Sequence, residues 1–100
     1  MPEITDIDHL TESPHAEVFE EREPRCVRLE LGAGEGVPPH THPGTNVVLH
    51  LLDGRLDLSL DGQGHELTPG DVARFSGERE VSPNAVEEST ALVVFAPVTE

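Results

Sequence analysis

Lysine, tryptophan and tyrosine are absent from this chain of 100 residues, which contains only three phenylalanines and one cysteine. With so few aromatic side chains, the core has to be built mostly from valine, leucine and alanine. The single cysteine, Cys26, excludes an internal disulfide. It stands in a stretch of alternating apolar residues, so we expect it to be a small buried hydrophobic side chain. The length predicts one domain with a modest core.

Long apolar runs are also missing. No stretch approaches the ~20 apolar residues that a membrane-spanning helix needs. The first twenty residues carry six acidic side chains, whereas a signal peptide begins with basic residues and an apolar run. We therefore expect a soluble, cytoplasmic protein with no membrane partner.

Negative charge dominates the composition. Twenty acidic residues stand against six basic ones, all of them arginine, and the formal net charge is −14. Such a surface repels nucleic acids and anionic membranes, so neither is expected as a partner. Because lysine is normally among the commonest residues, its absence beside so many carboxylates is typical of a halophilic protein, one that works in molar salt. At that concentration the Debye length is about 3 Å and the self-repulsion is screened.

Apolar and polar residues alternate from Arg25 onward, which predicts half-buried strands. The expected strands are 25–31, 45–52, 56–60, 65–67, 71–75, 81–86 and 90–95, with one short strand in the segment before them. Asp53-Gly54, Asp61-Gly62 and Pro69-Gly70 supply turns. The fold class is therefore all-β, a single-domain antiparallel sandwich or barrel. Residues 1–24 are expected to form an arm that packs on the barrel, and residues 25–100 the barrel itself.

Two histidines, His40 and His42, are the residues that point to chemistry. At this spacing on a strand they share one face, with Cα atoms about 6.6 Å apart. Two neutral imidazoles so placed can converge on a metal ion, and imidazole suits Zn, Cu, Fe and Ni. The pair alone is a weak signal, because surface histidines also pair by chance.

The surroundings of the two histidines resemble a known family. The run Gly34-x5-His40-x-His42-x11-Gly54 is similar to the first conserved motif of the cupins, in which a Gly, two His, a Glu and a second Gly fall at set spacings. Pro69-Gly70-Asp71 and the strand after it resemble the start of the second cupin motif. The resemblance covers roughly residues 18–97. It implies a small jelly-roll β-barrel, often a homodimer, that binds a divalent transition metal ion (Zn, Ni, Fe, Mn or Cu) or a small molecule.

The match to the cupin motifs is incomplete at the metal ligands. The family's Glu falls on Val47 when counted back from Gly54, and on Asn46 when counted forward from His42. The histidine of the second motif falls on Val81. The chain therefore keeps two of the four usual ligands and lacks the carboxylate that a two-His-one-carboxylate iron site needs.

The phase of the strand after the motif decides which residues could complete a metal site. If Asn46 faces inward, His50 shares its face, and both join His40 and His42 as candidate ligands. If Val47 faces inward, His50 faces out and is a surface or interface residue. The second phase preserves the family's spacing, and we favour it.

The remaining basic residues give no clear site. His9 and His15 lie in the N-terminal arm and carry no signal. Arg55 and Arg74 could bind a carboxylate ligand inside the barrel, but they stand outside the apolar phase of their strands and are interpreted as surface charges.

Three functions fit the sequence. The first is a binding or sensory cupin that holds a metal ion or a small molecule in its barrel. The second is a metal-dependent isomerase or oxygenase that acts on a small polar substrate. The third is a dimeric, non-catalytic interaction module whose barrel is packed solid. A homodimer is expected in any case, because Val48 and Leu52 would lie on the outer face of the sheet in the favoured phase.

The charge pattern gives a testable prediction. The melting temperature is expected to rise steeply between dilute buffer and molar salt, because salt screens the repulsion among the carboxylates. Differential scanning calorimetry over a series of salt concentrations measures this. A melting temperature that stays flat over the series would contradict the halophilic interpretation.

Overall fold

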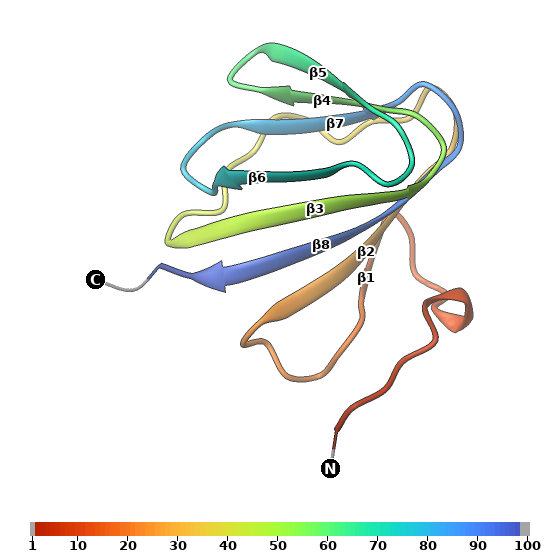
Figure 1. Ribbon diagram of the computed structural model, residues 1–100, viewed down its shortest axis with the longest axis vertical. Helices are drawn as coiled ribbons and strands as arrows, with labels where there is room; N and C mark the ends of the chain where they lie inside the picture. The colour runs from red at the N-terminus through yellow and green to blue at the C-terminus, as the bar shows by residue number, and fades with distance from the viewer. Residues whose placement is uncertain (1, 99–100) are drawn as a thin grey trace.

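Eight strands and one turn of 3-10 helix make up the fold in the computed structural model, which describes residues 2–98 (Figure 1). The elements are η1 (Ile7–His9), β1 (His15–Glu17), β2 (Arg25–Leu31), β3 (Thr45–Asp53), β4 (Leu56–Leu60), β5 (Gln63–Leu67), β6 (Val72–Ser76), β7 (Val81–Ala85) and β8 (Ser89–Pro97). The strands from β2 onward differ from the expected ones by no more than one or two residues at their ends. Within residues 2–98, no helix has the length and apolar character to cross a membrane.

All strand pairs are antiparallel and form two sheets. One sheet has five strands in the order β1-β2-β8-β3-β6, and the other has three in the order β5-β4-β7. The two sheets face each other as the walls of a small barrel (Figure 1). The prediction of an all-β antiparallel barrel is confirmed.

Strand β3 lies inside the larger sheet, because it pairs with β8 on one side and with β6 on the other. Val47, Leu49 and Leu51 are buried, with exposed fractions of 1%, 2% and 0%. The residues between them are only half-buried. Successive side chains of a strand point to opposite faces, so the three buried residues face the smaller sheet, and Asn46 and His50 face away from it.

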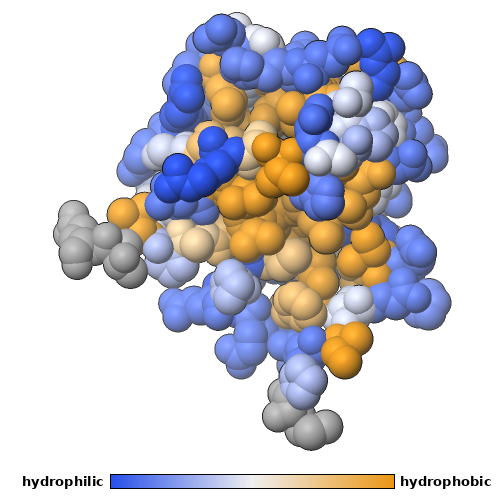
Figure 2. All heavy atoms as spheres, viewed as in Figure 1, coloured by the Kyte–Doolittle hydropathy of each residue, from blue (hydrophilic) through white to orange (hydrophobic). Residues whose placement is uncertain are grey.

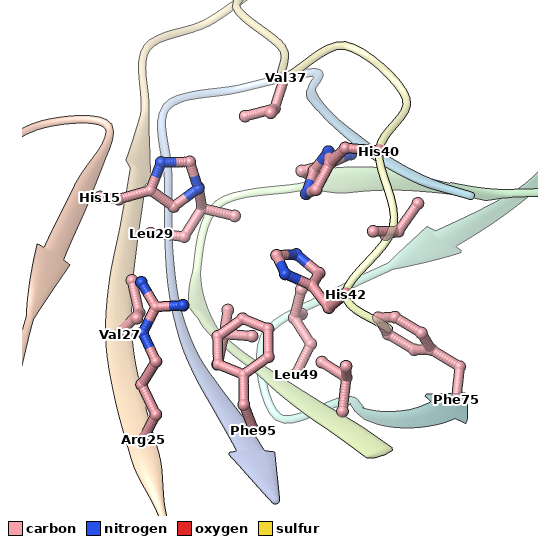
Figure 3. Close-up of a pocket in the computed structure, with 14 residues that line it drawn as sticks. His15, Arg25, Val27, Leu29, Val37, His40, His42, Leu49, Phe75 and Phe95 are labelled. Atoms are coloured by element: carbon pink, nitrogen blue, oxygen red, sulfur yellow. The ribbon is translucent and has the colours of Figure 1, made fainter. Parts of the chain in front are cut away.

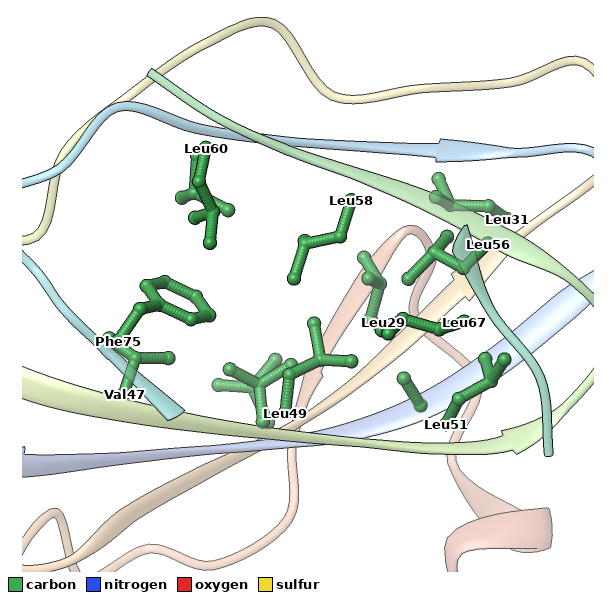
Figure 4. Close-up of a cluster of buried hydrophobic side chains, with 14 of the residues drawn as sticks. Leu29, Leu31, Val47, Leu49, Leu51, Leu56, Leu58, Leu60, Leu67 and Phe75 are labelled. Atoms are coloured by element: carbon green, nitrogen blue, oxygen red, sulfur yellow. The ribbon is translucent and has the colours of Figure 1, made fainter. Parts of the chain in front are cut away.

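The hydrophobic core lies between the two sheets (Figure 4). From the smaller sheet, β4 contributes Leu56, Leu58 and Leu60, which are all buried. They lie opposite the inward residues of β2, β3 and β8, which belong to the same cluster. The core therefore depends on aliphatic side chains, as the scarcity of aromatic residues requires; Phe75 and Phe95 are its only aromatic members within residues 2–98.

A buried arginine fastens the N-terminal arm to the outer face of β2. The exposed fraction of Arg28 is 4%. Its Nη1 and Nη2 atoms donate hydrogen bonds to the backbone carbonyls of Ile7 (2.7 Å) and Glu12 (3.1 Å). Further along the arm, β1 pairs with β2. The arm is thus held both by side-chain hydrogen bonds and by strand pairing.

The outer face of the larger sheet carries apolar side chains next to the arm. Val48 and Val94 are Cα partners on β3 and β8, and both are half-buried. Val72 on the edge strand β6 is 62% exposed. Figure 2 shows one face of the molecule, with apolar atoms gathered over β3 and β8 and polar atoms along the margins. Leu52 on β3 is also half-buried.

Two neighbouring leucines test the phase of β3. Leu51→Ala is expected to lower the free energy of unfolding by about 2–5 kcal/mol, because it leaves a void in the core. Leu52→Ala removes the same atoms from the outer face and should cost under ~1 kcal/mol. Chemical denaturation in molar salt measures both values. Equal losses from the two variants would contradict the burial pattern of β3.

Candidate functional site

A cavity of about 330 Å³ lies between the sheets, toward the end of the barrel where β2 and β3 begin and β8 ends. Ten of its lining residues are apolar: Val27, Leu29, Val37, Val47, Leu49, Phe75, Val81, Pro83, Val93 and Phe95. The other four are His15, Arg25, His40 and His42 (Figure 3). Its volume falls within the range of small-molecule sites, about 300–1,000 Å³. The interior of the barrel is therefore not packed solid, which removes the support for the third function considered above.

His40 is positioned by pairing between the glycine-rich connection and β7. The backbone N–H of His40 donates to the carbonyl of Val81 (3.1 Å), and the N–H of Val81 donates to the carbonyl of His40 (2.8 Å). The side chain of His40 is held as well, because its Nδ1 lies 2.8 Å from the carbonyl oxygen of Pro38. A carbonyl only accepts, so Nδ1 carries the proton, and in the neutral tautomer this leaves the lone pair on Nε2.

His42 is held by a second set of backbone contacts. Its N–H donates to the carbonyl of Gly77 (2.7 Å), and its carbonyl accepts a hydrogen bond from the hydroxyl of Thr45 (2.7 Å). A side chain at position 77 would overlap the His42 carbonyl, so this close approach requires glycine. The imidazole ring of His42 lies edge-on to that of His40, with 4.7 Å between centroids, and 4.6 Å from the ring of Phe95.

The imidazoles of the cavity are electrostatically coupled. Burial lowers the pKa of His42, and the neighbouring His40, Arg25 and His15 lower it further. Burial also lowers the pKa of His15; His40 and Arg25 act in the same direction, and Glu17 opposes them. A pKa below the usual 6.5 leaves both rings neutral at pH 7, so that each can accept one hydrogen bond and donate another.

Arg25 is the one permanently charged side chain among the described residues that line the cavity. Its Nε and Nη2 atoms donate to the carboxylate of Glu17, with an Nη2 to Oε2 distance of 2.6 Å. Its guanidinium carbon lies 5.1 Å from the centre of the Phe95 ring, a cation–π contact. The guanidinium is therefore fixed from two sides at the edge of the cavity.

The four residues proposed from the sequence as metal ligands do not all converge. His40 and His42 both line the cavity. Asn46 and His50 lie on the opposite face of β3 from Val47 and are not part of the lining. Of the two phases considered for this strand, the structure has the one that preserves the family's spacing, and it turns both side chains away from the histidine pair.

The positions that would complete a metal site are apolar. Val47, where the resemblance places the family's Glu, has Phe75 and Phe95 as its cross-strand neighbours. Val81, where the resemblance places the histidine of the second cupin motif, is the bridge partner of His40. Within residues 2–98, no group of three or more His, Cys, Asp or Glu side chains is arranged to hold a metal ion. Three imidazoles line the cavity, but they are not arranged as a group that could share one ion, and a guanidinium stands beside them, so the lining does not fit a transition metal held by the protein alone.

The sequence reasoning missed two residues of the cavity, Arg25 and His15. Arg25 could have been found, because it shares the parity of Val27 and Leu29, whose side chains face the interior. His15 faces the same side because it is the Cα partner of Leu29 across the β1–β2 pair. No local sequence pattern predicts the register between β1 and β2, so the sequence alone could not place His15 at the cavity.

Two facing antiparallel sheets with a pocket between them define a class of small barrels built as a double-stranded β-helix. Residues 27–95 match the family described as the cupin domain. The chain belongs to the cupin family, as the glycine and histidine spacing predicted.

The chain is also similar to known proteins. The chain is 35% identical over 69 residues to quercetin 2,3-dioxygenase of Bacillus subtilis strain 168; the match covers 69% of this chain and 20% of that protein. The chain thus spans only a fifth of the length of this relative. KdgF from a Halomonas species has the same fold, with a TM-score of 0.84, 18% identity, and coverage of 100% of this chain and 97% of that one. A protein from Thermus thermophilus has a TM-score of 0.81, 23% identity, and coverage of 96% of this chain and 98% of that one.

The missing ligands make a prediction about metal affinity. The wild-type protein is expected to retain no stoichiometric Ni²⁺ or Zn²⁺ after soaking and desalting, whereas Val81→His, which adds an imidazole to the cavity lining at the bridge partner of His40, is expected to retain the metal. Elemental mass spectrometry measures the content. His40→Ala/His42→Ala, made in both backgrounds, is the control. Near one metal ion per wild-type chain, lost in the double variant, would contradict our assignment.

Proposed function

We propose that this cupin binds one small organic molecule in the cavity between its sheets. The observation that carries the proposal is the composition of the cavity wall, in which ten apolar residues surround the space and four polar ones offer specific contacts. Small-molecule sites have this character, an apolar surface with a few placed polar groups. The wall comes from both sheets and from the connection before β3, so the barrel itself forms the site.

The size of the cavity supports a ligand with an apolar part. Apolar cavities of roughly 150 Å³ already take up benzene in other proteins. A ligand that buried about 100 Å² of apolar surface here would gain ~2.5 kcal/mol from the hydrophobic effect. Phe75 and Phe95 add flat surfaces on which a ring can pack.

Of the two ligands that the sequence suggested, the geometry supports the small molecule better than the metal ion. His40 offers Nε2 with a free lone pair, which is the observation in favour of a metal. Against it stand the valines at positions 47 and 81 and the positive charge of Arg25 among the lining residues. We therefore do not propose metal-dependent isomerase or oxygenase chemistry for this chain.

Two further expectations from the sequence stay predictions, namely a homodimer and a cytoplasmic location. The half-buried valines on the outer face, Val48 and Val94, support the homodimer, since apolar rows on an exposed sheet face usually mark an interface.

Binding in the cavity is tested with benzyl alcohol as a neutral aromatic probe. We expect it to shift the backbone amide NMR signals of Val27, Leu49 and Val93 in the wild-type protein. Val37→Trp fills the cavity from the connecting segment and should abolish these shifts. Val86→Trp is the matched control, because Val86 is 53% exposed and is not among the lining residues. Shifts that persist in Val37→Trp, or that never reach the lining residues, would contradict the proposal.

A further inference from the structure

The charge of the cavity is opposite to that of the protein. Acidic side chains outnumber basic ones by more than three to one in the sequence, yet none of the described residues that line the cavity is acidic. The lining contains one arginine and three histidines instead. Since low-dielectric walls strengthen any charge interaction within, this arrangement favours an anion over a cation inside the cavity.

Arg25 has hydrogen-bond donors left over for such an anion. A guanidinium carries five N–H donors, two of them on Nη1 and two on Nη2. Glu17 is bound side-on, through Nε and Nη2. Within residues 2–98, Nη1 has no hydrogen-bond partner, so both its donors and the second Nη2 donor stay available. Together they form the end-on edge of the fork, which matches the two oxygens of a carboxylate.

The guanidinium of Arg25 is also held in position before a ligand binds. Glu17 and the face of Phe95 restrain it before any ligand arrives. A group that is already ordered loses little freedom when it binds, which raises the affinity it can give. Arg25, His42 and Phe95 also line a second hollow of about 300 Å³, so they stand where the apolar cavity meets a more polar vestibule. Figure 3 shows the guanidinium and the His42 ring on either side of Phe95.

We infer that the ligand of this cavity is a small organic monocarboxylate with an apolar body. The carboxylate accepts hydrogen bonds from the free edge of Arg25, and from a ring N–H of His42, while the apolar body lies among Val27, Leu49 and Val93. The inference rests on the proposed function, since it names the chemical class of the molecule that the cavity takes.

Glu23 also lines the second hollow, but Glu17, which is paired with Arg25, is the charge that most directly opposes this assignment. Its carboxylate neutralises part of the guanidinium charge, and its side chain is 38% exposed. The pairing is partly exposed to solvent, so it orients the guanidinium but contributes little free energy. Arginine with its five donors can bridge two carboxylates, one at each edge. Removing the charge of Glu17 should consequently strengthen the binding of an anion, which separates a ligand-binding Arg25 from one that serves the ion pair only.

The experiment compares three probes of similar shape and different charge: phenylacetate, phenylacetamide and phenethylamine. Each is titrated into the full chain in the same salt at pH 7 and followed by NMR shifts of the lining residues. Phenylacetate is expected to bind about tenfold more tightly than phenylacetamide, since hydrogen bonds between charged groups are the stronger ones. Phenethylamine is expected to bind most weakly.

Variants assign the preference to Arg25. Arg25→Gln is expected to remove the advantage of phenylacetate over phenylacetamide. Arg79→Gln is the matched control, because Arg79 makes an ion pair with Asp61 (2.9 Å) and is not among the residues that line the cavity. It should keep the wild-type preference. Glu17→Gln keeps a side-chain oxygen that can accept a hydrogen bond from Arg25 but removes the negative charge, so it is expected to bind phenylacetate more tightly than the wild type does.

The outcomes separate this inference from the proposed function. If phenylacetamide or phenethylamine binds the wild-type cavity as tightly as phenylacetate, the carboxylate assignment is overturned and the binding function stands. The assignment is also overturned if Arg25→Gln keeps the preference, or if Glu17→Gln binds phenylacetate more weakly. If none of the three probes shifts the lining residues, both the inference and the proposed function fail. The comparison of the three probes in the wild-type protein tests the carboxylate assignment even if a variant does not fold.

Discussion

The alternation of side chains along β3 is the constraint on which the rest of the structure depends. The strand pairs on both edges, so its register is fixed twice, by β6 and by β8. A shift of one residue would turn Val47, Leu49 and Leu51 out to solvent and bring Asn46 and His50 into the barrel. The same alternation places Val47 between Phe75 and Phe95 in the wall of the cavity. Core and cavity chemistry therefore follow from one choice of phase.

Much of the fold could be predicted because its signals are local. Alternation marks the strands, and Asp-Gly and Pro-Gly mark the turns, so strand bounds needed no knowledge of the tertiary structure. The histidine pair was found through its spacing to Gly34 and Gly54. The site was harder, because its other polar residues come from separate strands. Arg25 carried a weak local signal in its parity with Val27, whereas His15 reaches the cavity through a pairing that only the folded chain defines.

The protein as a whole is acidic, whereas its cavity is lined by basic side chains and no acidic one among the described residues. A surface rich in carboxylates keeps the protein hydrated in concentrated salt, but it also repels anions at long range. In molar salt the Debye length is about 3 Å, so that repulsion would not extend into the cavity, whereas contacts at hydrogen-bond distance would survive. The arginine and the imidazoles can then act on a ligand without interference from the distant surface. The two features suit each other in a saline solvent and conflict in dilute buffer.

The bridge between His40 and Val81 separates the architecture of the barrel from its chemistry. The two residues are joined through backbone atoms alone, and the same holds for the pairing of Val47 with its neighbours. Evolution can therefore exchange the side chains at positions 47 and 81 without disturbing a single hydrogen bond of the scaffold. A lineage could lose or regain a metal centre by a few point substitutions while its strand pattern stayed the same. Membership of the family therefore predicts the fold of a chain. To predict its reaction as well, one has to know which residues stand at positions 47 and 81.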